Sequence, residues 1–508
     1  MSARTTVGGR RILASYPLLE PLVHVTIEED VETKKIRYVV HEPRLSKDDR
    51  RLMQLILQIL EEELILTRES IPETKEDAAK LLHKAIKEIV QKYHLLNLKK
   101  EEDRQRFERI AYYIVRDHIY LGRIYPLLLD ERIEDISCAG PGLPIYVWHE
   151  DYEFIPTNIV YRSDEELDSF IVRLAYLARR QISLANPLLD AALPDGSRIQ
   201  LSYGREVTKR GSSFTIRRSR STPLTIVNIV RLNTLSSEMG AYVWFLLEHK
   251  RSIMVAGPTA CGKTTTLNCF TMFFRPDIKI VSIEETPELQ LAHENWLQSV
   301  ARRGFGTGES FIGEVTLFDL LKAAMRQRPD FIIVGEIRGA EAYTLFQAIA
   351  TGHGGMCTIH ADSAEAAIHR LTSPPMNIPH PLLPNMNLLC VQIRTHLGRK
   401  VVRRLVRMVE INEYDPQRGL LTNDVFRWDP ARDRFIYAGR SYLIERLQRE
   451  FGYTHEYVET ELKRRKTVID WLVKSRIDQP SEIRKVIRSY YIDPEKTYQR
   501  ALAGLSKK

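Results

Sequence analysis

The sequence of 508 residues contains no run of about 18 apolar residues, the length that a transmembrane helix needs. Its N-terminus carries charges but lacks the apolar core of a signal peptide. Cysteine is scarce, with an odd count of five, and no two cysteines have the close spacing of a zinc site or a redox motif. These absences favour a protein of the reducing cytoplasm, which would act on a membrane only from outside the bilayer.

The composition is otherwise that of a globular protein. Hydrophobic residues make up 44% of the chain and charged residues 28%, and the length favours several domains over a single core. The net charge of +8 is spread over the whole chain, so it leaves nucleic acid, an anionic membrane surface and acidic proteins open as partners.

One stretch carries the clearest chemistry. Residues 257–264 read GPTACGKT, a complete Walker A motif, between an apolar strand pattern at 253–256 and a helical pattern at 264–274. The glycines let the backbone curl so that N–H groups face phosphate oxygens, above the positive end of the helix. We expect Lys263 to reach the β- and γ-phosphates of ATP, and Thr264 to bind Mg²⁺. The residues expected to hold the nucleotide are Gly257, Pro258, Thr259, Ala260, Cys261, Gly262, Lys263, Thr264 and Thr265.

Acidic residues end two later strands of what reads as a parallel α/β sheet at about 227–395. The strand pattern at 278–283 is followed by Glu284 and Glu285, and the pattern at 331–335 ends in Glu336, a Walker B pattern with Glu in place of Asp. Open α/β sheets bind ligands at this end of their strands. The expected catalytic acids are Glu284, Glu285 and Glu336, and the expected Mg²⁺ ligands are Thr264, Glu285 and Glu336. The alternative for Glu336 is a surface acid at a strand end.

Two histidines flank a glycine pair in residues 351–361. A strand pattern at 356–359 carries His360 toward the same edge of the sheet, where an imidazole can contact the γ-phosphate or relay its loss. The spacing of His353 and His360 is no metal signature, and each histidine alone would more often have a structural role.

The patterns in the rest of the chain mainly predict secondary structure and domains. Strand patterns occur at 24–27 and 36–40, and three amphipathic helical segments at 45–122, whose apolar stripes indicate a core more simply than a docking face. Short strands, a helix at 164–180 and a hairpin signal at Asp195-Gly196 predict a small α+β domain. Arg198, Arg217 and Arg218 are candidates to reach a phosphate across a domain or subunit boundary, or simply solvated arginines.

The C-terminal part continues with a strand pattern at 401–410 and charged helical patterns at 442–450, 454–475 and 481–491. The basic run at 463–466 predicts a solvated helix face, or less simply a surface for anionic lipid. The predicted domains are an N-terminal extension with a helical module (1–122), an α+β domain (123–218), a linker (219–226), an α/β domain with C-terminal strands (227–440) and a helical charged extension (441–508).

The order of these motifs resembles the type II/type IV secretion and pilus ATPase superfamily. Its nucleotide motifs are matched by residues 257–264 (Walker A), 283–288 (acidic box), 332–338 (Walker B) and 352–361 (His box). Residues 133–137, 144–147 and 194–198 look like the N-terminal domain of the archaeal branch, which includes the archaellum motor and archaeal pilus assembly ATPases. Glu285 stands where many relatives have Asp, and the paired CxxC element of bacterial secretion ATPases is missing, as in the archaeal form.

The resemblance implies an α/β fold with a RecA-like P-loop ATPase domain, preceded by a small α+β N-terminal domain and flanked by helical N- and C-terminal extensions. It also implies a homohexameric ring with nucleotide between the two domains and with arginines contributed from a neighbouring domain or subunit. We favour Arg326 and Arg328 for that role. The implied partners are a polytopic membrane platform protein, cytoplasmic regulatory subunits and an anionic lipid surface, without nucleic acid.

Through that platform the family's motors assemble or rotate a type IV pilus-like filament, which implies a cytoplasmic protein peripherally associated with the inner face of the cell membrane. Two rivals stay open. A nucleic-acid translocase or helicase would also use a RecA-like ring, but the sequence shows no stacking stripe, helix-turn-helix or oligonucleotide-binding signature. A regulator that binds ATP without hydrolysing it is disfavoured by the full set of acidic residues.

Overall fold

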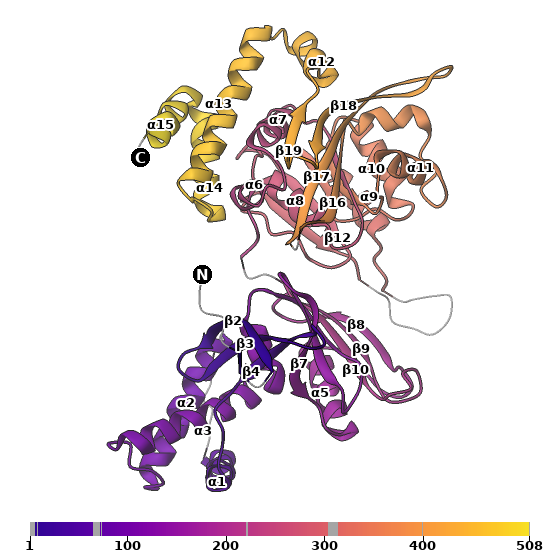
Figure 1. Cartoon of the computed structure of the whole chain (residues 1–508). Coiled ribbons are helices and arrows are strands. Elements are labelled where there is room, and N and C mark those ends of the chain that lie inside the picture. Colours follow the sequence, from indigo (N-terminus) through magenta and orange to yellow (C-terminus); the bar gives the residue numbers. More distant parts are fainter. Residues whose placement is uncertain are drawn as a thin grey trace. The chain divides into compact units, whose positions relative to one another are not determined.

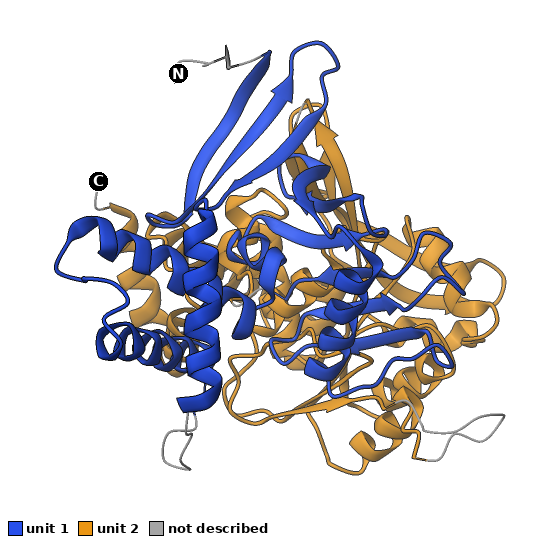
Figure 2. Cartoon of the chain, turned by 90° about the horizontal axis from the view of Figure 1, so that it is seen from below, with its two compact units in different colours: residues 1–220 blue, residues 221–508 orange. Residues whose placement is uncertain are grey.

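The computed structural model describes residues 6–7, 9–63, 72, 74–219, 222–302, 313–398 and 400–506. The chain forms two compact units, residues 1–220 and residues 221–508, which are coloured separately in Figure 2. Each unit has its own sheet and its own buried apolar side chains, which is the pattern of two domains. Among the described residues, no helix is long and apolar enough to cross a membrane.

The first unit combines one mixed sheet with helices (Figure 1). The described strands follow the order β1-β2-β3-β4-β7-β6-β5-β10-β9-β8. Their bounds are β1 Thr6–Val7, β2 Arg10–Leu19, β3 Val23–Asp30, β4 Ile36–His41, β5 Ile133–Cys138, β6 Pro144–His149, β7 Glu153–Val160, β8 Leu188–Ala192, β9 Arg198–Ser202 and β10 Ser213–Arg217. The helices are α1 Lys47–Glu63, α2 Lys75–Lys92, α3 Glu101–His118, α4 Tyr125–Leu129 and α5 Asp164–Leu177, with a 3₁₀ turn, η2, at Gly122–Ile124.

The predicted boundary after residue 122 falls inside this unit. Strand β4 pairs with β7 through Tyr38 and Thr157, so strands from both sides of that boundary share one sheet. The three expected helices are present as α1, α2 and α3, and their apolar stripes bury Ile56, Ile86 and Ile110 in a common cluster. The stripes therefore form a core, as the simpler interpretation predicted.

The second unit is an α/β domain whose sheet has the order β13-β12-β14-β15-β11-β16-β17-β18-β19. The strands from β13 to β16 in this order are parallel, and β17 to β19 continue the sheet antiparallel. Their bounds are β11 Ile253–Ala256, β12 Ile280–Glu284, β13 Trp296–Val300, β14 Phe331–Val334, β15 Gly354–Ile359, β16 Leu388–Leu397, β17 Lys400–Asp415, β18 Gly419–Asp429 and β19 Arg434–Tyr437.

Helices cover both faces of this sheet, which explains why its central parallel strands β11, β14 and β15 are buried throughout. One buried cluster joins the sheet to α6, α7, α8 and the C-terminal helices, and another joins it to α9, α10 and α11. The bounds are α6 Ile226–Arg231, α7 Ser237–Glu248, α8 Lys263–Thr271, α9 Leu317–Met325, α10 Glu341–Ala350, α11 Ala364–Thr372, η3 His380–Asn385, α12 Tyr442–Phe451, α13 His455–Lys474, α14 Pro480–Ile492 and α15 Pro494–Ser506. The predicted fold class, a RecA-like α/β domain after a smaller α+β domain with helical extensions, is confirmed.

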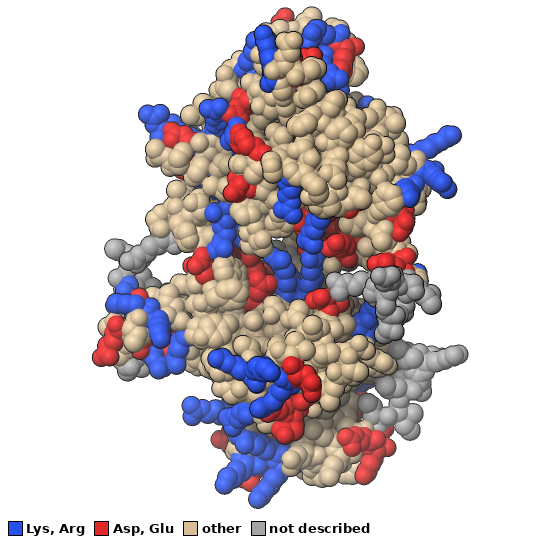
Figure 3. All heavy atoms as spheres, turned by 90° about the vertical axis from the view of Figure 1, so that its right-hand side faces the viewer, with Lys and Arg blue, Asp and Glu red and all other residues tan. Residues whose placement is uncertain are grey.

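The C-terminal helices belong to the core of the second unit, and Figure 1 shows α13 beside α7. Within the basic run at 463–466, Arg465 is only 2% exposed and pairs with Glu461 at 3.1 Å. Arg464 pairs with the same carboxylate at 3.0 Å. The run is therefore not the continuous solvated or lipid-facing surface that its charge predicted. On the face drawn in Figure 3, basic and acidic side chains likewise lie next to one another.

Candidate functional site

The phosphate loop follows the carboxyl end of β11 and leads into α8, which begins at Lys263. Gly262 has a φ of +92°, a left-handed conformation that glycine adopts without strain. A Cβ on Gly257 would lie 2.3 Å from the carbonyl oxygen of Gln392, so only glycine fits there. Ala260 adopts a φ of +61° despite its side chain. The loop therefore has the tight curl that directs backbone N–H groups inward.

Lys263 lies inside the loop rather than pointing into solvent, since it is 7% exposed. Its ammonium donates to the carbonyl oxygens of Gly257 and Pro258, both at 3.0 Å. The same Nζ lies 3.2 Å from Nδ1 of His360, which directly follows β15. The structure thus joins the expected phosphate-binding lysine to the expected phosphate-sensing histidine.

His360 in turn contacts the Walker B acid at the end of β14. Its Nε2 lies 3.2 Å from Oε1 of Glu336. Arg338 donates to both oxygens of that carboxylate, at 2.8 and 2.9 Å, and its Nη1 reaches Glu285 at 3.4 Å. Lys263, His360, Glu336, Arg338 and Glu285 therefore form one continuous chain of contacts along the carboxyl edge of the sheet.

The charges of the groups in this chain of contacts determine which of those groups are protonated. Burial would raise the pKa of Glu336, but the hydrogen bonds and charge of Arg338, with the charge of Lys263, hold it below its usual value. Burial and the charge of Lys263 lower the pKa of His360. At neutral pH the carboxylate is therefore charged and the imidazole neutral. A neutral ring with its proton on Nε2 accepts a hydrogen bond from Lys263 on Nδ1 and donates one from Nε2 to Glu336.

Glu284 has a different task from the catalytic one that we expected. It is 2% exposed, and its Oε1 accepts from the backbone N–H groups of Glu288 and Leu289, both at 2.8 Å. Its Oε2 accepts from the amide of Gln298 at 2.8 Å. Burial raises its pKa. Both carboxylate oxygens thus shape the turn after β12, and Glu285 is the acid that faces the chain of contacts.

The structure does not bring Arg326 and Arg328 to this site. Both are exposed and lie in the turn between α9 and β14. Because β14, β15 and β11 are parallel, this turn is at the amino edge of the sheet, whereas the phosphate loop is at the carboxyl edge. His353 precedes β15 at the same amino edge, where it contacts the carbonyl oxygen of Ala348 at 3.0 Å.

Two residues that the sequence reasoning missed hold the phosphate loop from the other side. Gln392 of β16 is 1% exposed, donates to the carbonyl oxygen of Cys261 and accepts from Thr266, both at 2.6 Å. Arg403 of β17 donates to the carbonyl oxygen of Ala260 at 3.1 Å. The signal for Gln392 was an amide that directly follows the apolar run 388–391. Arg403 had no distinguishing signal among the arginines around it.

The arginine candidates of the first unit differ in their contacts. Arg218 donates to the carbonyl oxygens of Leu128 at 2.7 Å and Ile133 at 3.1 Å, and burial lowers its pKa. Arg217 lies 3.9 Å from Asp135 and its side chain is half exposed. Arg198 is on β9 and has a buried Nε. Arg218 is therefore occupied in closing the turn after α4, and a role for Arg198 and Arg217 at a phosphate stays a prediction.

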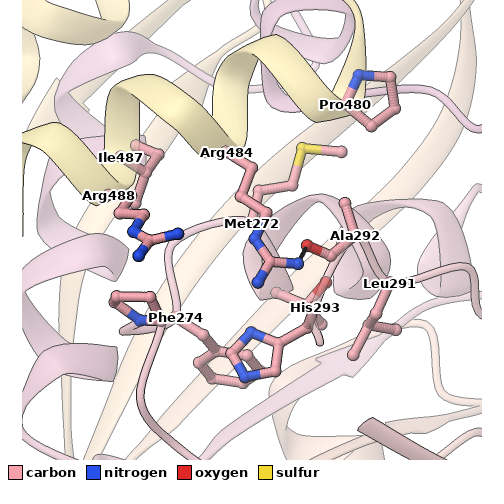
Figure 4. Close-up of a pocket in the computed structure, with 11 residues that line it drawn as sticks. Met272, Phe274, Leu291, Ala292, His293, Pro480, Arg484, Ile487 and Arg488 are labelled. Carbon is pink, nitrogen blue, oxygen red and sulfur yellow. Dashed lines mark hydrogen bonds between the residues drawn. The ribbon is translucent and has the colours of Figure 1, made fainter. Parts of the chain in front are cut away.

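A small hollow near α14 is not part of this site (Figure 4). It lies at Thr271 and Met272, the end of α8 opposite the phosphate loop, and Arg484 crosses it to donate to the carbonyl oxygen of Ala292. Its lining includes no acid. The chain of contacts at the phosphate loop is therefore the better candidate for nucleotide and metal.

The donors at the phosphate loop fit Mg·ATP. The close approach at Gly257 and the left-handed Gly262 make a cradle that a Cβ would fill, with an ammonium at its centre. Carboxylate and hydroxyl oxygens, the ligands that Mg²⁺ prefers, are present as Glu285, Glu336 and Thr264. Among the described residues there is no cluster of three metal-binding His, Cys, Asp or Glu side chains.

Comparisons with known proteins identify relatives of this chain. The family model described as "Type II/IV secretion system protein" matches residues 121–476. The protein MJ0900 of Methanocaldococcus jannaschii is 35% identical over 497 residues, covering 94% of this chain and 88% of its own. MJ1287 of the same organism is 48% identical over 260 residues, 51% of this chain and 95% of its own.

A bacterial relative carries a functional name. The type IV secretion system protein VirB11 of Bartonella henselae is 28% identical over 291 residues, 50% of this chain and 80% of its own. The family match covers both the phosphate loop and the acids and histidine that surround it. The chain therefore belongs to the family of type II/IV secretion system ATPases.

Proposed function

We propose that this chain is an ATP-hydrolysing motor that assembles or rotates a type IV pilus-like surface filament through a membrane platform protein. The observation that carries the proposal is the continuous chain from Lys263 through His360, Glu336 and Arg338 to Glu285 at the mouth of the phosphate loop. A protein that only bound ATP would not need a charged Walker B acid beside a neutral imidazole.

Each residue has a proposed role. The N–H groups of residues 257–265 and the Lys263 ammonium bind the phosphates. Glu336 orients the water that attacks the γ-phosphorus, the bond to the bridging oxygen breaks, and ADP and inorganic phosphate leave with the water's protons. A bound Mg²⁺, near Thr264, Glu285 and Glu336, would neutralise charge on the phosphates. His360, joined to both Lys263 and Glu336, reports the loss of the γ-phosphate.

The output of the motor is proposed from the family. We infer a homohexamer in the cytoplasm, held at the inner face of the cell membrane by a polytopic platform protein, in which hydrolysis moves the two units of each chain relative to one another. Regulatory subunits and anionic lipid are further proposed partners. The basic run at 463–466 lends no support to lipid binding, because its arginines pair with Glu461.

The test is ATP turnover of the purified protein alone, with anionic vesicles, and with single- or double-stranded DNA. Lys263→Ala should abolish nucleotide binding, and Glu336→Gln should retain binding but lose turnover, because an amide orients water less strongly than a carboxylate does. Lys250→Ala and Glu413→Gln, two exposed positions in the same unit, are the matched controls and should turn over ATP like the original chain.

The outcomes separate the rivals. Stimulation by vesicles and not by DNA supports the membrane motor. Stimulation by DNA alone, with a steep dependence on salt, would favour a translocase. Turnover that survives Glu336→Gln would remove the proposed role of the Walker B acid.

A further inference from the structure

The guanidinium of Arg338 contacts Glu336 and Glu285, the two carboxylates at this site that could bind a metal ion. It donates to the two oxygens of Glu336 at 2.8 and 2.9 Å and reaches Glu285 at 3.4 Å. Such a two-pronged, charge-assisted pair is among the stronger side-chain interactions. Glu336 and Glu285 are thus shared by one arginine, which any ion binding these carboxylates has to replace.

The backbone after β14 explains this placement. The N–H of Ile337 donates to the carbonyl oxygen of Thr358 at 3.0 Å, and the Ile337 side chain is fully buried. Glu336 and Arg338, the residues on either side of Ile337, contact each other instead of entering the core. Glu341 fixes the next turn, since its Oε1 accepts from the N–H groups of Arg338 at 2.6 Å and Gly339 at 2.7 Å. The Arg338 backbone is therefore fixed, and only its side chain has to move to leave the acids.

Arg338 is also near the expected position of the terminal phosphate. Glu336, which it contacts, lies 3.2 Å from His360, and His360 lies 3.2 Å from the ammonium of Lys263. The side chain is half exposed, so it has room to change rotamer. A guanidinium is suited to phosphate because its N–H groups match two oxygens at once.

We propose that Arg338 is the internal counter-ion of Glu336 and Glu285, that it gives up both carboxylates when Mg·ATP binds, and that the freed guanidinium then binds the terminal phosphate. This deepens the proposed function and rests on it. In this proposal Arg338 makes the contact with the nucleotide that we expected of Arg326 or Arg328. Because Arg338 leaves the two carboxylates only when the metal binds them, the position of its side chain depends on metal binding.

Binding rather than turnover tests the exchange. Fluorescent ATP and ADP analogues are titrated into the full-length protein and into Arg338→Gln over a series of Mg²⁺ concentrations. Because the variant lacks the guanidinium that competes with Mg²⁺ for the two carboxylates, it should need several-fold less Mg²⁺ for half-maximal binding of ATP. It should also lose most of the original chain's preference for ATP over ADP, because the contact to the terminal phosphate is gone. Arg338→Lys, which keeps the charge but not the two-pronged geometry, should fall between the two.

Arg440→Gln is the matched control. Arg440 makes a similar two-pronged pair with Glu445 at 2.8 and 3.2 Å, outside the site, so its removal should change neither quantity. If Arg338→Gln leaves the Mg²⁺ requirement unchanged or raises it, or keeps the preference for ATP, the proposal is overturned. A chain that binds Mg·ATP with this behaviour but never hydrolyses it would refute the proposed function and leave the exchange standing.

Discussion

At the scale of single residues, the protonation of His360 determines how the contacts at the phosphate loop respond to acid. Its ring takes a hydrogen bond from Lys263 on one nitrogen and faces Glu336 with the other. A proton added to Nδ1 would end the bond from Lys263 and place two positive charges 3.2 Å apart. The neutral ring is therefore part of the folded arrangement.

We predict that the nucleotide-free protein loses stability as the pH falls from 7.5 to 5.5. The folded state keeps the pKa of His360 below the ordinary histidine value of 6.5, so the unfolded chain takes up the proton first. The contribution is complete above the pKa of the unfolded chain, about 6.5, and is lost as the pH falls from there through the lower pKa of the folded state. Urea midpoints measured across this range should fall less for His360→Asn than for the original chain.

The exposed His455 provides the control for this experiment. Its side chain is 80% exposed, so His455→Asn should follow the original chain across the whole pH range. Equal slopes for His360→Asn and the original chain would show that protonation of this ring does not oppose folding.

At the scale of elements, Glu410 fastens the C-terminal helices to the sheet. It lies on β17, is fully buried and accepts from the Tyr242 hydroxyl of α7 at 2.6 Å. It also accepts from the backbone N–H of Tyr442 at 2.9 Å and from the hydroxyl of Ser441, the residues that begin α12. The amide of Asn423 on β18 completes the set at 3.0 Å. One carboxylate thus joins two strands and two helices.

Glu410→Ala should therefore be strongly destabilising. Each buried donor left without its acceptor costs about 1–3 kcal/mol, so we expect a loss of at least about 3 kcal/mol in the free energy of unfolding. Glu445→Ala, which removes an exposed pair with Arg440, should cost much less, because water screens an exposed ion pair. Urea denaturation measures both, and equal losses would contradict the role of Glu410.

At the scale of the whole molecule, no buried apolar cluster found among the described residues contains side chains of both units. Those of the first unit draw only on residues before 220, and those of the second only on residues after 221. Two separate cores predict two cooperative transitions.

Calorimetry should therefore resolve two transitions in the full-length protein. Added Mg·ATP should raise the temperature of one transition, because the phosphate loop belongs to a single core and a ligand stabilises what it binds. In Lys263→Ala the two transitions should remain, and the shift with Mg·ATP should disappear. A single transition in the original chain would mean that the units unfold together.

Much of this arrangement could be predicted because the motifs mark strand ends. The apolar runs before Gly257, Glu336 and His360 had to be neighbouring buried strands, so their ends had to meet. Gln392 could not be predicted in the same way, because its contact with Cys261 spans 131 positions of sequence. Glu284 and Glu285 are adjacent and identical in chemistry, and only the backbone turn decides which one is buried.

The arginines show the limit of composition most clearly. Arg326, Arg328 and Arg338 all lie near the Walker B strand in sequence, and nothing in residue type separates them. The direction of the parallel strands does, because it puts the first two before β14 and the third after it. The buried Arg465 is a similar case, since a run of basic residues gives no sign that one of them enters the core.

The burial of every cysteine has a practical consequence for observing this protein at work. Cys138, Cys261, Cys269, Cys357 and Cys390 are all buried and unbonded to one another, and burial raises the pKa of each thiol. Protonated, inaccessible thiols react slowly with maleimides. A cysteine introduced at an exposed position of each unit could therefore be labelled with a dye, with little labelling of the five native cysteines. Energy transfer between those dyes could follow the units through a cycle of turnover in the otherwise unaltered chain.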